Sequence, residues 1–380
     1  MILDYDVLKV IWWVLVGVLL IGFAITDGMD MGVGNLLRVV GKTDEERRVI
    51  INTIGPHWDG NQVWLITAGG AIFAAWPAVY AAAFSGFYVA MLLVLFALFF
   101  RPVGFDYRSK LGDAKWRNAW DWGLFAGGAV PSLVFGVAFG NLLLGVPFQL
   151  DPLLRPSYTG NFFGLLNPFS LVAGTLSFAM LSMHGGLWMQ MRVQDDIAAR
   201  AKPWIRITGL VSIAAFAIAG LWLYLGVDGY RVVSMPATDA LPNPLAKEVA
   251  VEAGAWFANY AAYPWMMLAP IVGFVGFAMA IFASASNRPG WGFVFSSLAM
   301  TGVILTAGFT MFPFVMPSSI MPGASFTLWD ASSSHLTLTV MFWAAVIFVP
   351  IVLSYTIWTY YKMWGRVTVE QIRETAHSAY

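Results

Sequence analysis

The sequence predicts an all-α integral membrane protein with nine transmembrane helices. Of its 380 residues, 59% are hydrophobic and only 11% are charged, whereas an ordinary soluble domain has about 25% charged residues. Runs of roughly 20 mostly apolar residues, the length that crosses a bilayer as a helix, occur nine times. They cover residues 10–38, 50–76, 79–100, 122–146, 165–190, 204–226, 256–283, 291–315 and 336–361. No soluble segment divides them, so we expect a single membrane domain over residues 1–380.

Two of these spans are irregular. Residues 50–76 begin with a polar half that contains Gly55 and Pro56. Only the turn at Trp76 and Pro77 separates this stretch from residues 79–100. Together the two stretches are far too long for one helix, so the sequence predicts two spans here.

The basic residues predict the orientation, because cytoplasmic loops collect Lys and Arg. Nine spans with the N-terminus outside place 17 of the 21 basic residues on the cytoplasmic side, and only Lys9, Arg155, Arg231 and Lys247 outside. A wrong number of spans would mix the two groups. We therefore expect a periplasmic N-terminus and a cytoplasmic C-terminus. The first nine residues are acidic, the wrong sign for a cleavable signal peptide, so the first span is expected to be retained.

Composition excludes several classes of function. The chain has no cysteine, which rules out disulfides, thiolate metal sites, iron–sulfur clusters and covalent c-type haem attachment. Its net charge is zero, which argues against nucleic-acid binding through bulk electrostatics. Two outer connections, residues 147–164 and 227–255, are rich in Pro and Gly, and we expect them to form ordered caps or partner contacts.

Three carboxylates lie inside the first two apolar stretches. Asp27 and Asp30 share one helix face because they are three residues apart. At 1.5 Å per residue, Asp30 and Asp59 lie about 18 and 25 Å from the connecting loop, so antiparallel neighbours would bring them to a similar depth. With His57, Asn61 and Gln62 nearby, two interpretations are open: a proton relay, or a hydrogen-bonded cluster that holds helices together, with or without a bound cation.

Other polar residues have structural interpretations of their own. Arg108 at the end of the third span suits the negative end of a helix dipole or a headgroup contact. Arg101 follows an apolar run directly, and it could pair with a cofactor carboxylate or with an aspartate. Asp121 opens the fourth span, where a helix N-cap is the favoured role.

The four histidines raise the question of haem, whose iron is often held by His in membrane bundles. His57 and His184 fall in or near spans, His335 opens the ninth, and His377 is in the tail. No pair has the spacing of a two-helix site with two His ligands. The sequence therefore favours histidines that form hydrogen bonds in a packed interior.

Several long motifs resemble subunit II of the cytochrome bd-type quinol oxidases. They span almost the whole chain: TDGMDMG at 26–32, PHWDGNQVW at 56–64, FFRPVGFDYR at 99–108, GNLL at 140–143, TGNFF at 159–163 and MFPFVMPSS at 311–319. The resemblance implies a fold of two four-helix bundles plus a peripheral helix in a bacterial inner membrane.

The same resemblance implies a function. The family's complex oxidises quinol near the outer face, reduces O2 to water with cytoplasmic protons and generates a proton motive force. It implies that a partner, subunit I, carries two b-type haems and one d-type haem, and that a small single-helix subunit and a quinone in this chain complete the assembly. For this chain it implies no haem of its own.

The resemblance also assigns residues. It implies that Asp59 belongs to a proton path, and that Trp58, Asp30, Arg101 and Asp121 support assembly or the haem site. Two neighbours in the same stretch are added to these: Asp27 as a further proton-path residue and His57 as a further support residue. Two alternatives are kept: a proton-coupled secondary transporter with a helix broken at Gly55 and Pro56, and a purely structural scaffold subunit.

Overall fold

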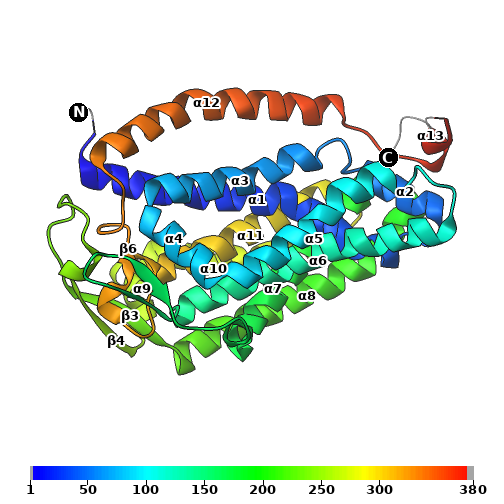
Figure 1. Ribbon diagram of the computed structural model, residues 1–380. Helices are drawn as coiled ribbons and strands as arrows, with labels where there is room; N and C mark the ends of the chain where they lie inside the picture. Colours follow the sequence, from blue (N-terminus) through cyan, green and yellow to red (C-terminus); the bar gives the residue numbers. More distant parts are fainter. Residues whose placement is uncertain (1–2, 375–380) are drawn as a thin grey trace.

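The structure is a computed structural model that describes residues 3–374 (Figure 1); His377 lies outside the described residues. Long helices run roughly side by side along one axis. The helices are α1 (Tyr5–Val40), α2 (Asp44–Asn52), α3 (Trp58–Ala75), α4 (Pro77–Gly86), α5 (Tyr88–Tyr107), α6 (Ala114–Leu144), α7 (Pro168–Arg192), α8 (Asp195–Gly226), α9 (Ala258–Ala262), α10 (Leu268–Ala285), α11 (Pro289–Met311), α12 (His335–Lys362) and α13 (Val369–Glu374).

Within the described residues, eight helices are long and apolar enough to cross a membrane. Of the nine predicted spans, only the second has no helix among these eight. Its only long helix is α3, which is not apolar enough. The reason is local: the first turns of α3 contain Asp59, Asn61 and Gln62, and these polar side chains lower its mean hydropathy.

The second and third predicted spans are both interrupted. Residues 50–76 divide into the end of α2, a turn over residues 53–57 and α3. Helix α2 begins outside the predicted span because Thr43 and Glu46 form a reciprocal capping box at its start. The third span is divided between α4 and α5 at Phe87. Each of the predicted spans 50–76 and 79–100 is therefore divided between two helices.

Two other predicted boundaries need correction. Helix α6 begins at Ala114 rather than Trp122, because the Asp113 carboxylate caps it by accepting a hydrogen bond from the Lys115 N–H at 3.0 Å. The seventh span begins later than residue 256, since short helical turns precede α10.

Helix α1 occupies the centre of the molecule. It packs against α3, α6 and α7, while α7, α8, α10 and α11 pack with one another. The crossing of α1 and α7 is unusually close: a Cβ atom on Gly32 would lie 1.9 Å from the Leu181 carbonyl oxygen. Small residues at such a crossing let two helix backbones meet, which is how helices associate in lipid. This contact places Asp27 and Asp30 deep in the protein.

Helix α12 lies across α1 and α3 on the outside of the molecule (Figure 1). Only 6% of its most apolar 18-residue window is buried, so most of its surface is free for lipid or another subunit. Its last turns are the exception, because Tyr360 reaches inward between α3 and α7.

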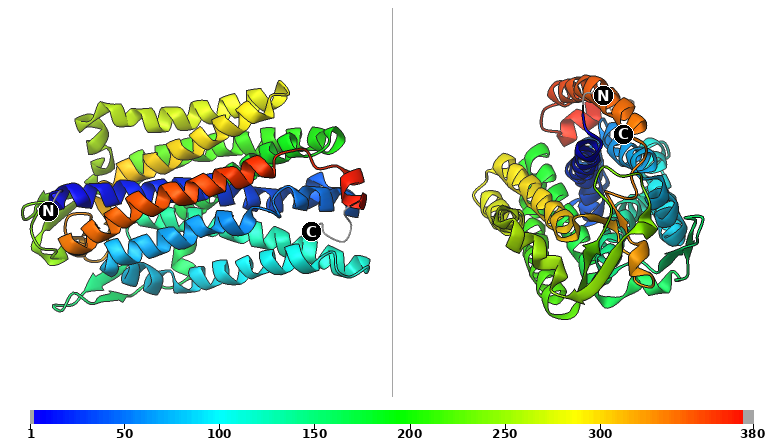
Figure 2. Two further views of the ribbon diagram at one scale, coloured as in Figure 1. Left: turned by 90° about the horizontal axis from the view of Figure 1, so that it is seen from above. Right: turned by 90° about the vertical axis from the view of Figure 1, so that its left-hand side faces the viewer.

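Short strands cover the end of the molecule that carries the N-terminus (Figure 2). They form three antiparallel pairs: β1 (Phe148–Leu150) with β2 (Pro156–Tyr158), β3 (Asp228–Ser234) with β4 (Glu248–Ala253), and β5 (Phe314–Met316) with β6 (Phe326–Thr327). The prediction that residues 147–164 and 227–255 form ordered caps is confirmed. The strands themselves were not predicted.

Two buried lysines stabilise this cap, and one of them fixes it to α1. The Lys9 ammonium, on α1, donates to the carbonyl oxygens of Thr238, Ala240 and Trp329 at 2.7–3.2 Å. Lys247 pairs with Asp330 at 3.0 Å. Burial lowers the pKa of the Lys247 amine, and the Asp330 carboxylate acts in the opposite direction.

Candidate functional site

A buried guanidinium joins α5 to α1. Arg101 makes a two-pronged ion pair with Asp27, at 2.5 Å from Nη2 to Oδ1 and 2.9 Å from Nη1 to Oδ2. Its Nη2 also lies 3.6 Å from Asp30 Oδ2. All three side chains are at most 3% exposed. Of the two partners considered for Arg101, the aspartate is the observed one.

Two uncharged side chains complete the cluster around Asp30. The Asn61 amide, on α3, donates to Asp30 Oδ2 at 2.9 Å. The Tyr360 hydroxyl, on α12, donates to Asn61 Oδ1 at 2.6 Å. We call Asp27, Asp30, Arg101, Asn61 and Tyr360 the Arg101 cluster. It ties together four helices that are far apart in sequence.

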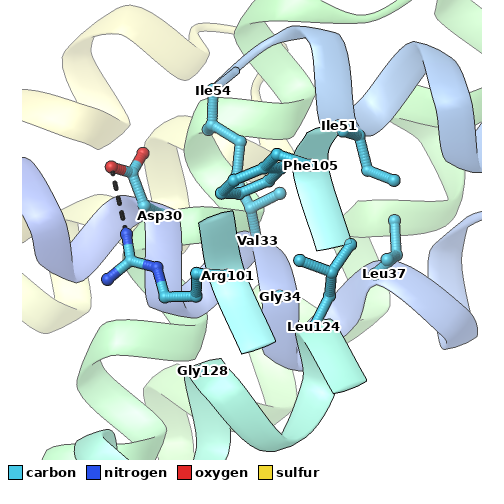
Figure 3. Close-up of a pocket in the computed structure, with 10 residues that line it drawn as sticks. All are labelled: Asp30, Val33, Gly34, Leu37, Ile51, Ile54, Arg101, Phe105, Leu124 and Gly128. Atoms are coloured by element: carbon cyan, nitrogen blue, oxygen red, sulfur yellow. Dashed lines mark ion pairs between the residues drawn. The ribbon is translucent and has the colours of Figure 1, made fainter. Parts of the chain in front are cut away.

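The second oxygen of Asp30 has no protein partner. Asp30 Oδ1 is buried and forms no hydrogen bond within residues 3–374. Asp30 and Arg101 line a cavity of about 10 Å³ (Figure 3), which is room for about one water molecule. The other walls are mostly apolar and include Ile51 and Ile54, so the cavity extends from Asp30 toward α2.

The charges in the Arg101 cluster do not balance. Two carboxylates meet one guanidinium, which leaves one negative charge in excess if both aspartates are ionised. Burying an unpaired charge is costly, and a group in that situation tends to be neutralised. A proton taken up by the carboxylate pair removes the excess, and Asp30, which has the longer ion pair, is the better acceptor.

Asp59 does not join this cluster. Its residue is exposed at the start of α3, and no hydrogen bond or ion pair ties it to the rest of the described chain. Asn61, two residues further on, faces Asp30 instead. Asp59 is therefore close to Asp30 in depth, as the helix rise predicts, but its side chain points to the outer surface. Trp58 packs against Phe105 on α5, with ring centroids 5.3 Å apart.

The buried histidines contact aromatic and polar groups. His57 stacks on Tyr360, with centroids 4.2 Å apart, and its Nε2 is buried without a hydrogen-bond partner in the described chain. Both ring nitrogens of His184 are engaged, with the Ser296 hydroxyl at 2.6 Å and the Ile25 carbonyl at 3.0 Å. Among the described residues, no three His, Asp or Glu side chains converge as a metal site.

A second buried arginine lies further along α5. Arg108 donates from Nε to Asp121 Oδ1 at 2.6 Å and from Nη2 to Asp44 Oδ1 at 2.8 Å. Arg47 also binds Asp121, at 2.9 Å, and Arg117 binds Asp44, at 2.5 Å. The headgroup contact predicted for Arg108 was wrong, since its side chain is 1% exposed. Its predicted position at the C-terminal end of a helix is correct, because Arg108 is the C-cap residue of α5. The cap role predicted for Asp121 was also wrong, because Asp121 lies inside α6 and Asp113 is the cap.

A larger, apolar cavity of about 190 Å³ lies between α1, α6, α7, α8 and α11. Phe23, Phe135, Phe169 and Phe216 contribute aromatic walls, and the few polar side chains include Thr306 and Thr310. Such a lining fits a long hydrocarbon or a quinone better than a charged molecule.

Sequence reasoning missed Tyr360 as a site residue. The signal was weak, because Tyr360 and Asn61 are 299 positions apart. Asp44 and Arg47 were missed as well, since both stand in a charged loop where exposed side chains are the usual outcome.

Fold and site together define a class: a multi-pass helical membrane protein with a deeply buried, hydrogen-bonded group of carboxylates. The sequence pattern of cytochrome bd terminal oxidase subunit II matches residues 8–363. "Cytochrome bd-I ubiquinol oxidase subunit 2" of Escherichia coli strain K12 is 58% identical over 378 residues, with all of both chains covered. "Cytochrome bd ubiquinol oxidase subunit 2" of Bacillus subtilis is 33% identical, covering 94% of this chain and 96% of that one.

A chain in the solved structure of the bd oxidase from Geobacillus thermodenitrificans has the same fold. It superposes with a TM-score of 0.68 at 15% identity and covers 94% of this chain and 97% of that one. The chain belongs to the cytochrome bd terminal oxidase subunit II family. It is a multi-pass membrane protein, and the transporter alternative is wrong.

Proposed function

We propose that this chain is the haem-free subunit of a quinol oxidase complex and that its Arg101 cluster holds a proton destined for O2 reduction. The family assignment supports the first part. The observation that carries the second part is the excess carboxylate at Asp30, whose free oxygen adjoins a water-sized cavity. The partner subunit I supplies haems b and d, at which O2 becomes water, and quinol is the electron donor.

The proposal includes a topology of nine membrane crossings, arranged as two four-helix bundles plus the peripheral α12, with the N-terminus in the periplasm and the C-terminus in the cytoplasm. Helix α3 would be the ninth crossing, since it lies along α1 beside the longer helices. The start of α1 and the last described helix, α13, lie at opposite ends of the molecule (Figure 1), as an odd number of crossings requires. In this orientation α2 is cytoplasmic, and the cavity beside Asp30 opens toward the side that supplies protons.

Within the cluster the residues have different roles. A side-chain amide does not pass on protons in its ordinary form, and Asn61 stands between Tyr360 and Asp30. Asn61 and Tyr360 therefore orient Asp30 rather than conduct protons to it. Arg101 neutralises Asp27 and fixes its position. The proton would reach Asp30 through the water-sized cavity. If such protons come only from the cytoplasmic side, their uptake generates a proton motive force.

Asp59 has a separate place in this proposal. An exposed carboxylate on a membrane helix is unfavourable next to lipid and favourable beside a polar group of another subunit. We place the surface of α3 around Asp59 against subunit I, where it continues the proton path. The apolar cavity would hold a quinone as a structural ligand, and a small single-helix subunit would join the complex elsewhere.

The test uses the complete complex with subunit I, measuring assembly, the haem spectrum, quinol-driven O2 consumption and proton uptake from the interior of vesicles. Loss of a proton-transferring group typically slows a reaction by about 10²–10⁴-fold. We expect Asp30→Asn and Asp59→Asn to slow turnover in assembled, haem-replete complex, whereas the exposed outer variant Asp151→Asn does not. Normal turnover and proton uptake in both variants would leave this chain as a scaffold and refute the proton path.

A further inference from the structure

A third buried arginine, Arg192 in the last turn of α7, has no carboxylate partner. The residue is 4% exposed, and no carboxylate within residues 3–374 forms an ion pair with it. Its Nη2 donates to the Met363 carbonyl oxygen at 2.7 Å, whereas Nε and Nη1 are buried without a hydrogen-bond partner in the described chain. The negative end of the α7 dipole favours a cation here, but by less than burial of the charge costs. One positive charge and two donors are therefore left over.

The carboxylates in the neighbourhood serve other cations. Asp195, at the start of α8, is exposed and pairs with Arg366 at 2.7 Å. Asp27 and Asp30 are bound within the Arg101 cluster. The charge at the end of α7 therefore lacks a counter-charge among the described residues.

His57, in the turn before α3, also has an unused buried nitrogen. The residue is 4% exposed, and its Nε2 has no partner within the described residues. The charge of Arg192 acts on the His57 ring, and a second buried positive charge beside it would be repelled. The ring is therefore neutral, and in this form it can carry its proton on Nε2 and donate it. The start of α3 has no side-chain cap, so its positive dipole end favours negative charge here as well.

Aromatic rings connect the two groups. The Arg192 guanidinium lies 5.0 Å from the ring centroids of both Trp188 and Trp364. The Trp188 ring also contacts Tyr360, on which His57 stacks, with centroid distances of 6.2 Å and 4.2 Å. Ring faces hold a cation through its charge, but they offer no lone pair to Nε and Nη1. The rings therefore fix the guanidinium in place and leave its two donors available.

Residues 363–367, which we call the strap, cover Arg192. The strap joins α12 to α13 at the end of the molecule that carries α2 (Figure 1). The Val367 N–H donates to the Arg192 carbonyl oxygen at 2.8 Å, so side chain and backbone of Arg192 both bind the strap. Trp364 is 59% exposed, and a small solute can reach the guanidinium from its side.

We infer that Arg192 and His57 bind a monovalent inorganic anion, with chloride as the physiological example. One guanidinium beside a neutral ring leaves a single positive charge, which a monoanion neutralises. Phosphate would bring a larger charge and more oxygen atoms than three donors can serve. A halide needs few donors, and the positive edges of aromatic rings suit it. The bound anion would join the end of α7 to the start of α3.

The experiment uses the complete oxidase complex, exchanged into gluconate and titrated with chloride, bromide or phosphate at constant ionic strength. Binding to the folded complex raises its thermal midpoint as the anion concentration rises. We expect stabilisation by both halides and not by phosphate. His57→Phe keeps the ring stack and should bind halide about tenfold more weakly, the change for losing one charge-assisted hydrogen bond. Arg192→Gln should lose the halide response, whereas Arg366→Gln, which removes an exposed arginine of the same strap, should respond as the unaltered complex does.

Anomalous diffraction from crystals of the unaltered complex in bromide locates the ion without any variant. We expect a bromide peak beside Arg192 Nε and Nη1; no peak there, or a carboxylate of another subunit bound to Arg192, would overturn the inference. Equal halide responses in Arg192→Gln and Arg366→Gln would place the anion elsewhere. Equal stabilisation by phosphate would refute a monovalent ligand. Arg192→Lys, which keeps the charge with fewer donors, covers a Gln variant that fails to assemble, and weaker halide binding is expected from it; unchanged affinity would count against the site.

Discussion

The two arginine clusters on α5 have opposite charge balances. Arg101 and Arg108 are seven residues apart, both are almost fully buried, and both bind carboxylates of other elements. Around Arg101 the carboxylates are in excess, and a proton is the smallest ion that restores neutrality. Around Arg108 the three guanidiniums of Arg47, Arg108 and Arg117 share only two carboxylates, Asp44 and Asp121. Burial alone therefore does not assign a role to a charged membrane residue; the remaining charge does.

The largest loss of stability should come from removing Arg101, because its cluster has one cation for two carboxylates. Arg101→Leu leaves Asp27 and Asp30 facing each other without a counter-charge, which is expected to cost about 3–5 kcal/mol and prevent assembly. Arg108→Leu should cost less, because Asp121 keeps Arg47 and Asp44 keeps Arg117. The yield of assembled complex and its thermal midpoint measure both, with the exposed Arg155→Leu as control. A costlier Arg108→Leu would contradict the comparison.

Removing a carboxylate should reverse that order. Asp121→Asn takes an anion from the cluster that lacks them, so Arg108 and Arg47 lose their shared partner, at an expected cost of about 2–3 kcal/mol. Asp30→Asn replaces a carboxyl group that its proton already makes neutral, and it should change stability by less than about 1 kcal/mol. Thermal unfolding of the two purified complexes compares them directly. Equal losses would show that charge balance does not distinguish the clusters.

A smaller effect is expected from the hydroxyl that orients Asn61. Tyr360→Phe removes the 2.6 Å hydrogen bond to Asn61 Oδ1 and leaves a buried acceptor unsatisfied, at a cost of about 1–1.5 kcal/mol. Tyr361→Phe is the matched control, because this neighbouring side chain is 75% exposed. Chemical denaturation of the complex measures the difference. If the two variants were equally stable, Tyr360 would not support Asp30.

The smallest effect concerns pH at the start of α2. Burial acts to raise the pKa of Glu46, but Arg200 and the backbone N–H groups of Lys42 and Thr43 outweigh it and hold the pKa below its usual value. This stabilisation is present above the ordinary Glu range and is lost as pH falls through the lowered pKa. The protection of α2 amides against hydrogen exchange should fall as pH drops below the ordinary Glu range. In Glu46→Gln, α2 amides should be less protected at neutral pH than in the unaltered protein, with a loss of stability below about 1 kcal/mol.

Much of the architecture follows from the sequence, because long apolar runs have few alternatives to helices in a bilayer. Gly55 and Pro56 marked the irregularity at residues 53–57, but the break at Phe87 was not predicted, since hydropathy is averaged over a window longer than a turn. Asp121 shows a related limit. Apolar patterning marks where the membrane begins, whereas α6 begins two turns earlier, at the Asp113 cap.

The charged residues of the site were predicted, whereas the contact between Asn61 and Tyr360 was not. Asp27, Asp30 and Arg101 stood out because charges in apolar runs are costly, and the structure brings them together. Asn61 and Tyr360 belong to helices whose mutual contact depends on how α12 crosses α3, which local sequence does not encode. The orientation of α3 about its own axis decides where the Asp59 side chain points. Asn61 faces the cluster and Asp59 faces outward, although they are only two residues apart.

Infrared spectroscopy of the assembled complex tests most directly whether the Arg101 cluster holds a proton. Spectra in H2O and D2O would be compared for the unaltered complex, Asp30→Asn and Asp121→Asn. We predict a band from a protonated carboxylic acid that shifts in D2O, is absent in Asp30→Asn and is retained in Asp121→Asn. An unchanged band in Asp30→Asn would contradict a proton at Asp30.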